Sequence, residues 1–386
     1  MQLHPQVAAL ADLCRQHRRT LHRIPEIGLE EYQTQAYLLG VLHILQPDCL
    51  QTLPPTGVKA VFYAKSPLGT IAFRADMDGL RVSEETVAPY ASTRPGCMHA
   101  CGHDEHLTPL LRLDKLISDN RDALRSNIVL LFQPGEEGFA GAKLMIENGA
   151  LENPHVGRIY GLHVWPTVPY GKIGVRWGYM MANSCEFDIL VHGKSAHGAS
   201  PQMGVDAVVA AAELITLLQT IITRSLDPHQ DALLTIGKIT GGTARNVIAD
   251  RVELNGTLRS FSAQNYDTIV QKVRSMSEGL ATATGAKFEF HSLMSYPCLE
   301  NPRPMVEDFY RYISMRDVEL VEPVMAAEDF AYYQQRLPGL FLFLGTLDDE
   351  NKQPLHNACF NYREDVLLYG VEVFRRLALE EPLNES

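Results

Sequence analysis

Basic residues are scarce in this sequence. Its 386 residues include 34 Lys and Arg against 46 Asp and Glu, which gives a formal net charge of −12 and a pI near 5.6. Without a basic stripe to displace counterions from phosphates, a nucleic-acid partner is excluded. The richest basic patch, residues 15–23, is predicted to be the solvated face of an early helix. Small anionic molecules are not excluded, because local arginines can bind them.

A secretory signal and a long apolar run are also missing. Residues 1–15 are polar, and no segment approaches eighteen consecutive apolar residues. The seven cysteines are odd in number and irregularly spaced, which favours a reducing compartment over a disulfide framework. We therefore expect a soluble, cytoplasmic protein that does not bind membranes. Its length and 46% hydrophobic content predict a sizeable core and two or three domains.

Metal-ligating side chains are concentrated in one short segment, residues 96–106, which reads G-C-M-H-A-C-G-H-D-E-H. Thiolate, imidazole and carboxylate groups bind divalent transition metals, so this segment predicts a metal site. Side chains two apart share a face of an extended chain, so Cys101 and His103 can converge while His99 flanks them. The following helix is expected to begin with Asp104 as its cap. The alternative is a set of ordinary histidines with an inert thiol.

Three predicted strands end in side chains of the same chemical kind. In an open α/β sheet the site lies at the carboxyl ends of the strands, so these side chains are expected to converge with the cluster. They are Asp76 and Asp78 after strand 70–74, Glu136 and Glu137 after strand 127–133, and His163 at the end of strand 159–163.

The order of predicted elements gives an α/β fold in which a second domain interrupts the first. Between residues 184 and 295 the pattern is strand, helix, two strands, helix, strand, which fits a ferredoxin-like α+β module. We expect residues 1–180 and 296–386 to form a catalytic domain, a sheet flanked by helices. Residues 181–295 are expected to form an inserted lid and dimerisation domain.

Five candidate ligands exceed the needs of one tetrahedral zinc. They suit a two-metal site in which one group, best the Cys101 thiolate, bridges the ions. Adjacent carboxylates can then divide the work, Glu137 binding metal while Glu136 takes a proton from water. In isolation the pair could also be two surface glutamates in a turn. The predicted ligands are Cys101, His103, Glu137, His163 and His356.

Seven motifs, in order along the chain, resemble those of peptidase family M20, in its amidohydrolase branch (subfamily D). They are R-A-D-M-D-G-L, M-H-A-C-G-H-D, Q-P-G-E-E-G, G-L-H-V, G-K-S-A-H-G-A-S-P, A-E-D-F and L-H-N, spread over residues 20–365. The branch includes hippurate hydrolase, indole-3-acetyl-amino-acid hydrolases and N-acetyldiaminopimelate deacetylase.

The resemblance implies a binuclear site for Zn or Mn, with Co or Ni as substitutes in vitro, bound by the same five ligands. It implies Glu136 as general base and acid, and a zinc-exopeptidase-like catalytic domain whose lid often dimerises. Asp78 matches an acid that orients a metal-binding imidazole elsewhere in the family, although Asp76 stands here where that imidazole would be.

Three residues of the predicted lid receive roles from the same resemblance. His197 could stabilise the developing oxyanion, from its own subunit or a neighbour's. Asn246 and Arg259 could hold the carboxylate of the amino-acid product, or both could be structural. Glu328 and Asp329 of A-E-D-F are expected to cap a helix. Glu105 departs from the family, which usually has a small residue there, and is expected to add a negative charge near the metals. It could point away along the helix or narrow the range of substrates accepted.

The sequence therefore predicts a metal-dependent amidohydrolase that removes the acyl group from an N-acyl amino acid. A dipeptidase on the same scaffold is the nearest alternative. A metal-retaining binding module without turnover would not need the Glu136–Glu137 pair, and a structural zinc domain would have compactly spaced ligands. The acyl group and the amino acid cannot be derived from the sequence.

Overall fold

The computed structural model describes residues 1–229 and 231–380, which divide into two compact units. Unit 1 comprises residues 1–180, 300–322 and the part of the chain from Asp329 onward; unit 2 comprises residues 181–299 and 323–328.

Unit 1 is built on an eight-stranded mixed sheet with strand order β1-β2-β4-β3-β5-β16-β6-β15. Strands β4, β3, β5 and β16 are parallel neighbours, and β1 and β2 are antiparallel at one edge. The strands are β1 (Cys49–Leu53), β2 (Gly57–Phe62), β3 (Thr70–Asp76), β4 (Asn127–Gln133), β5 (Arg158–Pro169), β6 (Ile173–Val175), β15 (Val318–Leu320) and β16 (Gly339–Leu347).

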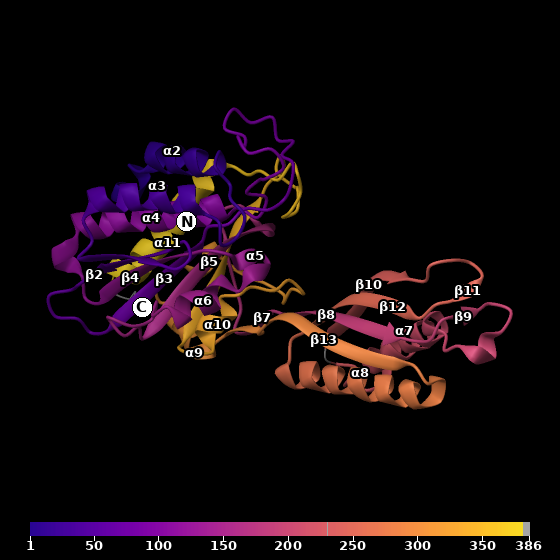
Figure 1. Ribbon diagram of the computed structural model, residues 1–386. Coiled ribbons are helices and arrows are strands. Elements are labelled where there is room, and N and C mark those ends of the chain that lie inside the picture. The colour runs from indigo at the N-terminus through magenta and orange to yellow at the C-terminus, as the bar shows by residue number, and fades with distance from the viewer. Residues whose placement is uncertain (230, 381–386) are drawn as a thin grey trace. The chain divides into compact units, whose positions relative to one another are not determined.

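Helices cover both faces of this sheet, with α2, α3 and α4 on one side and α6, α9 and α10 on the other (Figure 1). This arrangement confirms the predicted fold class, and it explains why β4 is apolar from Ile128 to Phe132, because all of these residues are buried. The helices are α1 (Pro5–Ala8), α2 (Ala11–His22), α3 (Tyr32–Leu45), α4 (His103–Asp119), α5 (Glu136–Phe139), α6 (Gly141–Glu147), α9 (Arg303–Phe309), α10 (Ala331–Gln334) and α11 (Leu367–Leu379).

Unit 2 contains a four-stranded antiparallel sheet in the order β10-β12-β8-β13, with helix α8 alongside it (Figure 1). Along the chain its main elements follow the predicted ferredoxin-like order. They are β8 (Asn183–His192), α7 (Ala207–Arg224), β10 (Ala232–Gly241), β12 (Arg251–Ser260), α8 (Ala263–Thr284) and β13 (Lys287–Tyr296). Short strands β9 (Ala196–His197) and β11 (Val247–Ile248) pair with each other, as do β7 (Gly178–Met181) and β14 (Leu299–Asn301).

Alternate residues of β8 are buried, and they form the core of unit 2 with α7 and α8. Among the described helices, α7 alone is long and apolar enough to cross a membrane. Its buried residues, Ala207, Ala210, Leu214, Leu218 and Ile221 among them, pack into this core.

Candidate metal centre

The candidate site residues of unit 1 come from the ends of parallel strands β3, β4 and β5, from the turn before α4 and from the late loop that carries His356. Asp78 follows β3, Glu136 and Glu137 follow β4, and His163 lies in β5. Parallel neighbours present their carboxyl ends at one edge of the sheet, so these side chains meet although they are far apart in sequence.

Asp78 connects His103 to the backbone of Glu136 and Glu137. Its Oδ1 lies 3.1 Å from His103 Nδ1, and the carboxylate also accepts the backbone N–H groups of Glu136 (3.1 Å) and Glu137 (2.9 Å). The bond to Nδ1 turns His103 Nε2 away from Asp78, and this buried nitrogen has no hydrogen-bond partner among the described residues. A nitrogen placed in this way fits a divalent cation.

The five predicted ligands lie close together. Cys101 Sγ is 3.4 Å from His163 Nε2, and His356 Nε2 is 3.0 Å from Glu137 Oε1. Potential donor atoms of Cys101, Glu137 and His356 all lie within 4.8 Å of one another, as do those of His103, Glu136 and Glu137. Glu137 belongs to both groups, so it could join two cation positions.

The segment carrying His356 is fixed by an unusual backbone. His356 has a φ of 65°, uncommon for a residue other than glycine, and its N–H donates to the carbonyl of Ala100 at 2.8 Å. This hydrogen bond ties the late loop directly to the turn that bears Cys101.

Gly102 makes the turn possible. It has a φ of 83° at the start of α4, and a Cβ there would lie 2.5 Å from Val164 Cγ2. Only glycine therefore allows the Cys101–His103 turn to approach β5 so closely. The structure corrects the predicted helix start, because Gly102 and not Asp104 occupies the cap position.

Peptidase family M20/M25/M40 is the family whose model matches, over residues 72–380. The chain belongs to this family. The prediction made from the motifs is confirmed.

N-acetyldiaminopimelate deacetylases are among the relatives. That of Leuconostoc mesenteroides is 36% identical over 368 residues, covering 93% of this chain and 94% of its own. That of Enterococcus faecalis is 39% identical over 360 residues, covering 92% and 94%. A crystal structure of a dinuclear metal-binding M20 peptidase from Bacillus subtilis superposes with a TM-score of 0.84 at 31% identity, over 96% of this chain and 98% of that one.

Sequence reasoning did not assign a role to the Asp76–His106 pair in this M20 chain. Asp76 Oδ1 lies 2.5 Å from His106 Nδ1, and His106 Nε2 accepts the N–H of Val164 at 2.9 Å. His106 is therefore a neutral ring that donates to Asp76. Its ring centroid is 4.3 Å from that of His163, so it supports a candidate ligand. The spacing of three residues from His103 on a helix was the available signal.

Electrostatics at the centre depend on burial. Burial raises the pKa of the Cys101 thiol well above its usual range, and Glu137 and Glu136 add to the shift. Burial also lowers the pKa of His163 well below its ordinary value, helped by His106. For His103 the neighbouring acids Asp76 and Asp78 outweigh burial and raise the pKa to about 10. The donor set therefore concentrates negative charge that a cation would balance.

The basic patch at residues 15–23 was predicted to be solvated, which is wrong for its central residues. Arg18 and His22 are 1% and 2% exposed. Asp104 Oδ2 accepts Arg18 Nε at 3.0 Å and lies 2.9 Å from His22 Nδ1. Rings of Tyr90 and Tyr362 lie 4.6 and 4.7 Å from the Arg18 guanidinium. Helix α2 therefore turns a charged face inward, where distant residues satisfy it.

Glu105 does not add the negative charge that was expected near the ligands. It is fully buried, and burial raises the pKa of its carboxyl well above the usual range despite the opposing charge of Arg18. The shift favours the neutral form of the group.

Asp329 connects β3 to the first turn of α6. It accepts from Arg74 Nη2 and from the N–H of Ala142 in the first turn of α6, both at 2.8 Å. Glu328 is also buried.

The remaining predicted residues lie in unit 2. His197 in β9 faces Val247 of β11, and the N–H of Gly198 donates to the carbonyl of Asn246, so His197 and Asn246 are near each other. Arg259 lies in a different sheet, on β12, where its Nη1 donates to the carbonyl of Leu258 at 3.0 Å.

Proposed function

We propose that the protein is a metal-dependent amidohydrolase that removes the acyl group from an N-acyl amino acid. The observation that carries the proposal is the division of the Glu136–Glu137 pair. Glu137 lies against His356 and belongs to both donor groups, whereas Glu136 belongs only to the one with His103 and stays outside the Cys101–Glu137–His356 group. The relatives named N-acetyldiaminopimelate deacetylase support the same reaction.

The residues present fit two divalent cations, which we propose to be Zn or Mn. Cys101, His103, Glu137, His163 and His356 would hold them, and the thiolate and imidazoles favour a transition metal over Mg or Ca. Such ions lower the pKa of water and polarise a carbonyl when bound.

Glu136 would act as the proton carrier. It is 6% exposed, and its position is fixed by the bond from its N–H to Asp78 and by the N–H of Asp329, 3.4 Å from its Oε1. A carboxylate held in this way can accept the proton of the attacking water and return it to the leaving amine. Asp78 would meanwhile keep the His103 ring in one orientation.

His197 of the proposed lid, residues 181–295, would serve as an oxyanion donor. Its Nδ1 accepts the N–H of Ala199 at 3.0 Å, so a neutral ring carries its proton on Nε2. The side chain is exposed and therefore accessible to a substrate. We propose that it acts from its own subunit or from a homodimer partner, and that Asn246 and Arg259 hold the product carboxylate.

We propose that the protein acts in the cytoplasm. N-acetyldiaminopimelate is the first substrate to test. A panel with that compound, hippurate and free dipeptides, each with Zn, Mn or Co, separates deacylase from dipeptidase. Preferential cleavage of dipeptides would favour the alternative.

Glu136→Gln tests the mechanism. The variant should bind metal normally and lose about 10²–10⁴-fold in kcat, while the exposed Glu147→Gln serves as a control with unchanged kcat. Near-normal turnover of Glu136→Gln would refute the proposed proton carrier.

A further inference from the structure

The turn that carries the proposed proton carrier is not held by regular helical geometry. Helix α5 has only four residues, and two of them have non-helical backbone angles: Glu137 (φ −73°, ψ 73°) and Gly138 (φ 88°, ψ 11°). The turn begins with Gly135 in the left-handed region, at φ 60° and ψ 48°. Because the first four N–H groups of any helix lack partners within it, those of α5 must be satisfied from elsewhere. The position of Glu136 therefore depends on tertiary contacts.

Two acidic side chains accept the N–H groups at the start of this turn. Glu31 Oε1 accepts the N–H of Gly135 at 2.8 Å. The carboxylate of Asp78 accepts the next two, those of Glu136 and Glu137. Three successive N–H groups are thus shared between an acid that precedes α3 and an acid that follows β3. Asp78 already has a role in the proposed site, whereas Glu31 has none.

Glu31 is itself fixed in place. It is 0% exposed, and its Oε2 accepts the hydroxyl of Thr56, in the turn between β1 and β2, at 2.5 Å. The neighbouring Leu29 packs against the same backbone, because a Cβ on Gly135 would lie 2.8 Å from Leu29 Cδ2. The segment before α3 therefore contacts the turn by packing as well as by a hydrogen bond.

The bond to Gly135 does not require a charge on Glu31. Burial and the nearby Asp78 raise the pKa of Glu31 to about 7, although the hydrogen bonds from Thr56 and Gly135 oppose the shift. A neutral carboxyl group and a carboxylate both keep an oxygen that accepts an N–H group. Both protonation states can therefore hold the turn.

We propose that Glu31 is a positioning residue for Glu136, which it holds through the N–H of Gly135. The inference rests on the proposed function, because it takes Glu136 as the proton carrier. Loss of the acceptor would leave the N–H of Gly135 without its partner, so the turn would relax and move the Glu136 side chain relative to the attacking water. A displacement of about 1 Å is enough to slow a reaction about 100-fold.

Glu31→Met tests the proposal in the metal-loaded, full-length protein, because methionine has a similar size and offers no oxygen to the N–H of Gly135. We expect kcat to fall about 10–100-fold, with KM and metal content close to those of wild type. Hydrogen exchange of the Gly135 amide should become at least about tenfold faster. Mass spectrometry of peptides covering residues 134–139 measures the exchange.

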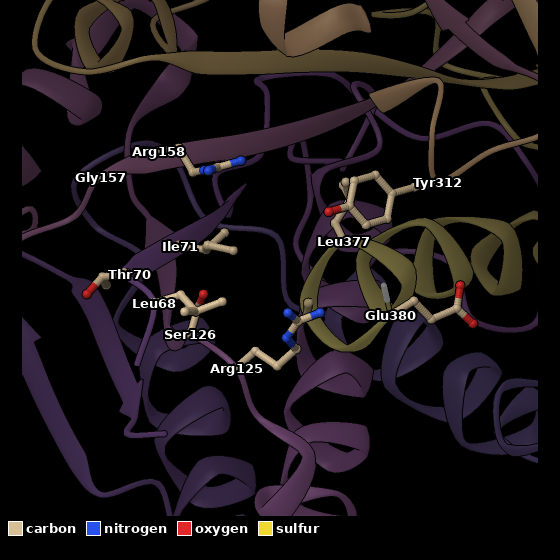
Figure 2. Close-up of a pocket in the computed structure, with 12 residues that line it drawn as sticks. Leu68, Thr70, Ile71, Arg125, Ser126, Gly157, Arg158, Tyr312, Leu377 and Glu380 are labelled. Atoms are coloured by element: carbon tan, nitrogen blue, oxygen red, sulfur yellow. The ribbon is translucent and has the colours of Figure 1, made fainter. Parts of the chain in front are cut away.

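Amides at the opposite ends of the same strands provide an internal reference. Figure 2 shows Thr70 and Gly157 beside a pocket of about 440 Å³ at those ends. The N–H of Gly157 donates to the carbonyl of Thr70 at 3.0 Å. Exchange at Gly157 should be unchanged in Glu31→Met. Equal acceleration at Gly157 and Gly135 would show that the whole unit is loosened, and it would contradict the proposal.

Glu372 gives a matched control. It is a buried glutamate of the same unit that also accepts a backbone N–H, that of His4 at 3.0 Å. Glu372→Met should lower stability and leave both kcat and exchange in residues 134–139 unchanged. Glu31→Gln is the conservative variant, since its amide oxygen can still accept the N–H of Gly135. It should recover most of the kcat that Glu31→Met loses.

Three results would overturn the proposal: wild-type exchange in residues 134–139 of Glu31→Met, a kcat of that variant equal to that of Glu372→Met, or a kcat of Glu31→Gln as low as that of Glu31→Met. If Glu31→Met does not fold, Glu31→Asp keeps the acid on a shorter side chain and should show both effects in weaker form. Wild-type exchange and kcat in Glu31→Asp would likewise overturn it.

Failure of the proposed function would be seen differently, as the absence of amide cleavage by the wild-type protein on the substrate panel. Exchange does not require turnover, so in that case the rates in residues 134–139 alone decide whether Glu31 holds the turn.

Discussion

The two units differ in what they bury. In the described residues of unit 2, the buried polar side chains are Asn183, Ser260, Asn265, Ser277 and Glu328, of which Glu328 alone is of a charged type. Unit 1 buries many charged groups, including Arg18, Arg74, Asp76, Asp78 and Asp104, each at most 1% exposed.

This contrast separates two ways of fixing a structure. The core of unit 2 is held mainly by apolar packing, which tolerates apolar substitutions of similar volume. Unit 1 holds its site with paired charges, whose removal leaves the partner buried and uncompensated.

The strongest test of the contrast is Asp104→Ala. It would leave Arg18 and His22 buried without their shared acceptor, so we expect unit 1 to lose about 3–5 kcal/mol of unfolding free energy. Chemical denaturation measures the loss. Asp12→Ala removes an exposed partner of Arg15 and should cost less than about 1 kcal/mol. Equal effects of the two substitutions would show that burial does not distinguish these pairs.

Asp114 should make stability depend on pH. Its buried carboxyl oxygens have no hydrogen-bond partner among the described residues, and burial raises its pKa to about 7 although Arg112 and Arg121 oppose the shift. This folded pKa exceeds the unfolded value of about 3.9. The contribution of Asp114 to the free energy of unfolding is therefore fully present below pH 4 and is lost as the pH rises to 7.

Asp114→Asn should therefore be more stable than wild type above pH 7 and should remove up to about 4 kcal/mol of pH dependence between pH 4 and 7. Denaturation curves across that window measure the difference. Asp119→Asn, exposed on the same helix, is the control. A difference between wild type and Asp114→Asn that does not change with pH would contradict the predicted shift.

Asp78→Asn addresses the link between buried charge and the site. Weakened orientation of His103 should reduce metal affinity about 10–100-fold, measured by competition with a chelator. Asp349→Asn, fully exposed, should leave the affinity unchanged. Unchanged affinity in Asp78→Asn would remove Asp78 from the set of positioning residues.

The smallest effects should come from matched apolar truncations. Ile189→Val in β8 of unit 2 and Ile128→Val in β4 of unit 1 shorten residues that are both 0% exposed. Each should cost about 0.5–1.5 kcal/mol, and hydrogen exchange should place the loss within its own unit. A much larger loss in unit 2 would show that its packing is less tolerant than its composition indicates.

Elements with a strong local pattern were predictable from the sequence. Strand 127–133 has the predicted bounds, because a continuous apolar run leaves little choice of structure. Strands β1, β6 and β15 were missed, since short edge or irregular strands form through pairing with distant segments.

Prediction of the site succeeded for side chains that follow strands and failed where partners are distant. Arg18 appeared solvated because its acceptor Asp104 lies 86 residues away and Tyr362 lies 344 residues away. His106 was noted only as part of a cluster, because Asp76 joins it through the tertiary fold. No local pattern contains that information.

Gly102 shows that the presence of every metal ligand does not by itself make an active site. A single methyl group there would meet Val164 beside His163 and push the Cys101 turn off the strand, while every metal-binding residue stayed in place along the chain. Such a chain would retain every ligand and the proton-carrying carboxylate and still have no working catalyst. The activity of a homologue thus depends partly on the absence of a Cβ atom at this position. A comparison of functional residues alone does not examine that feature.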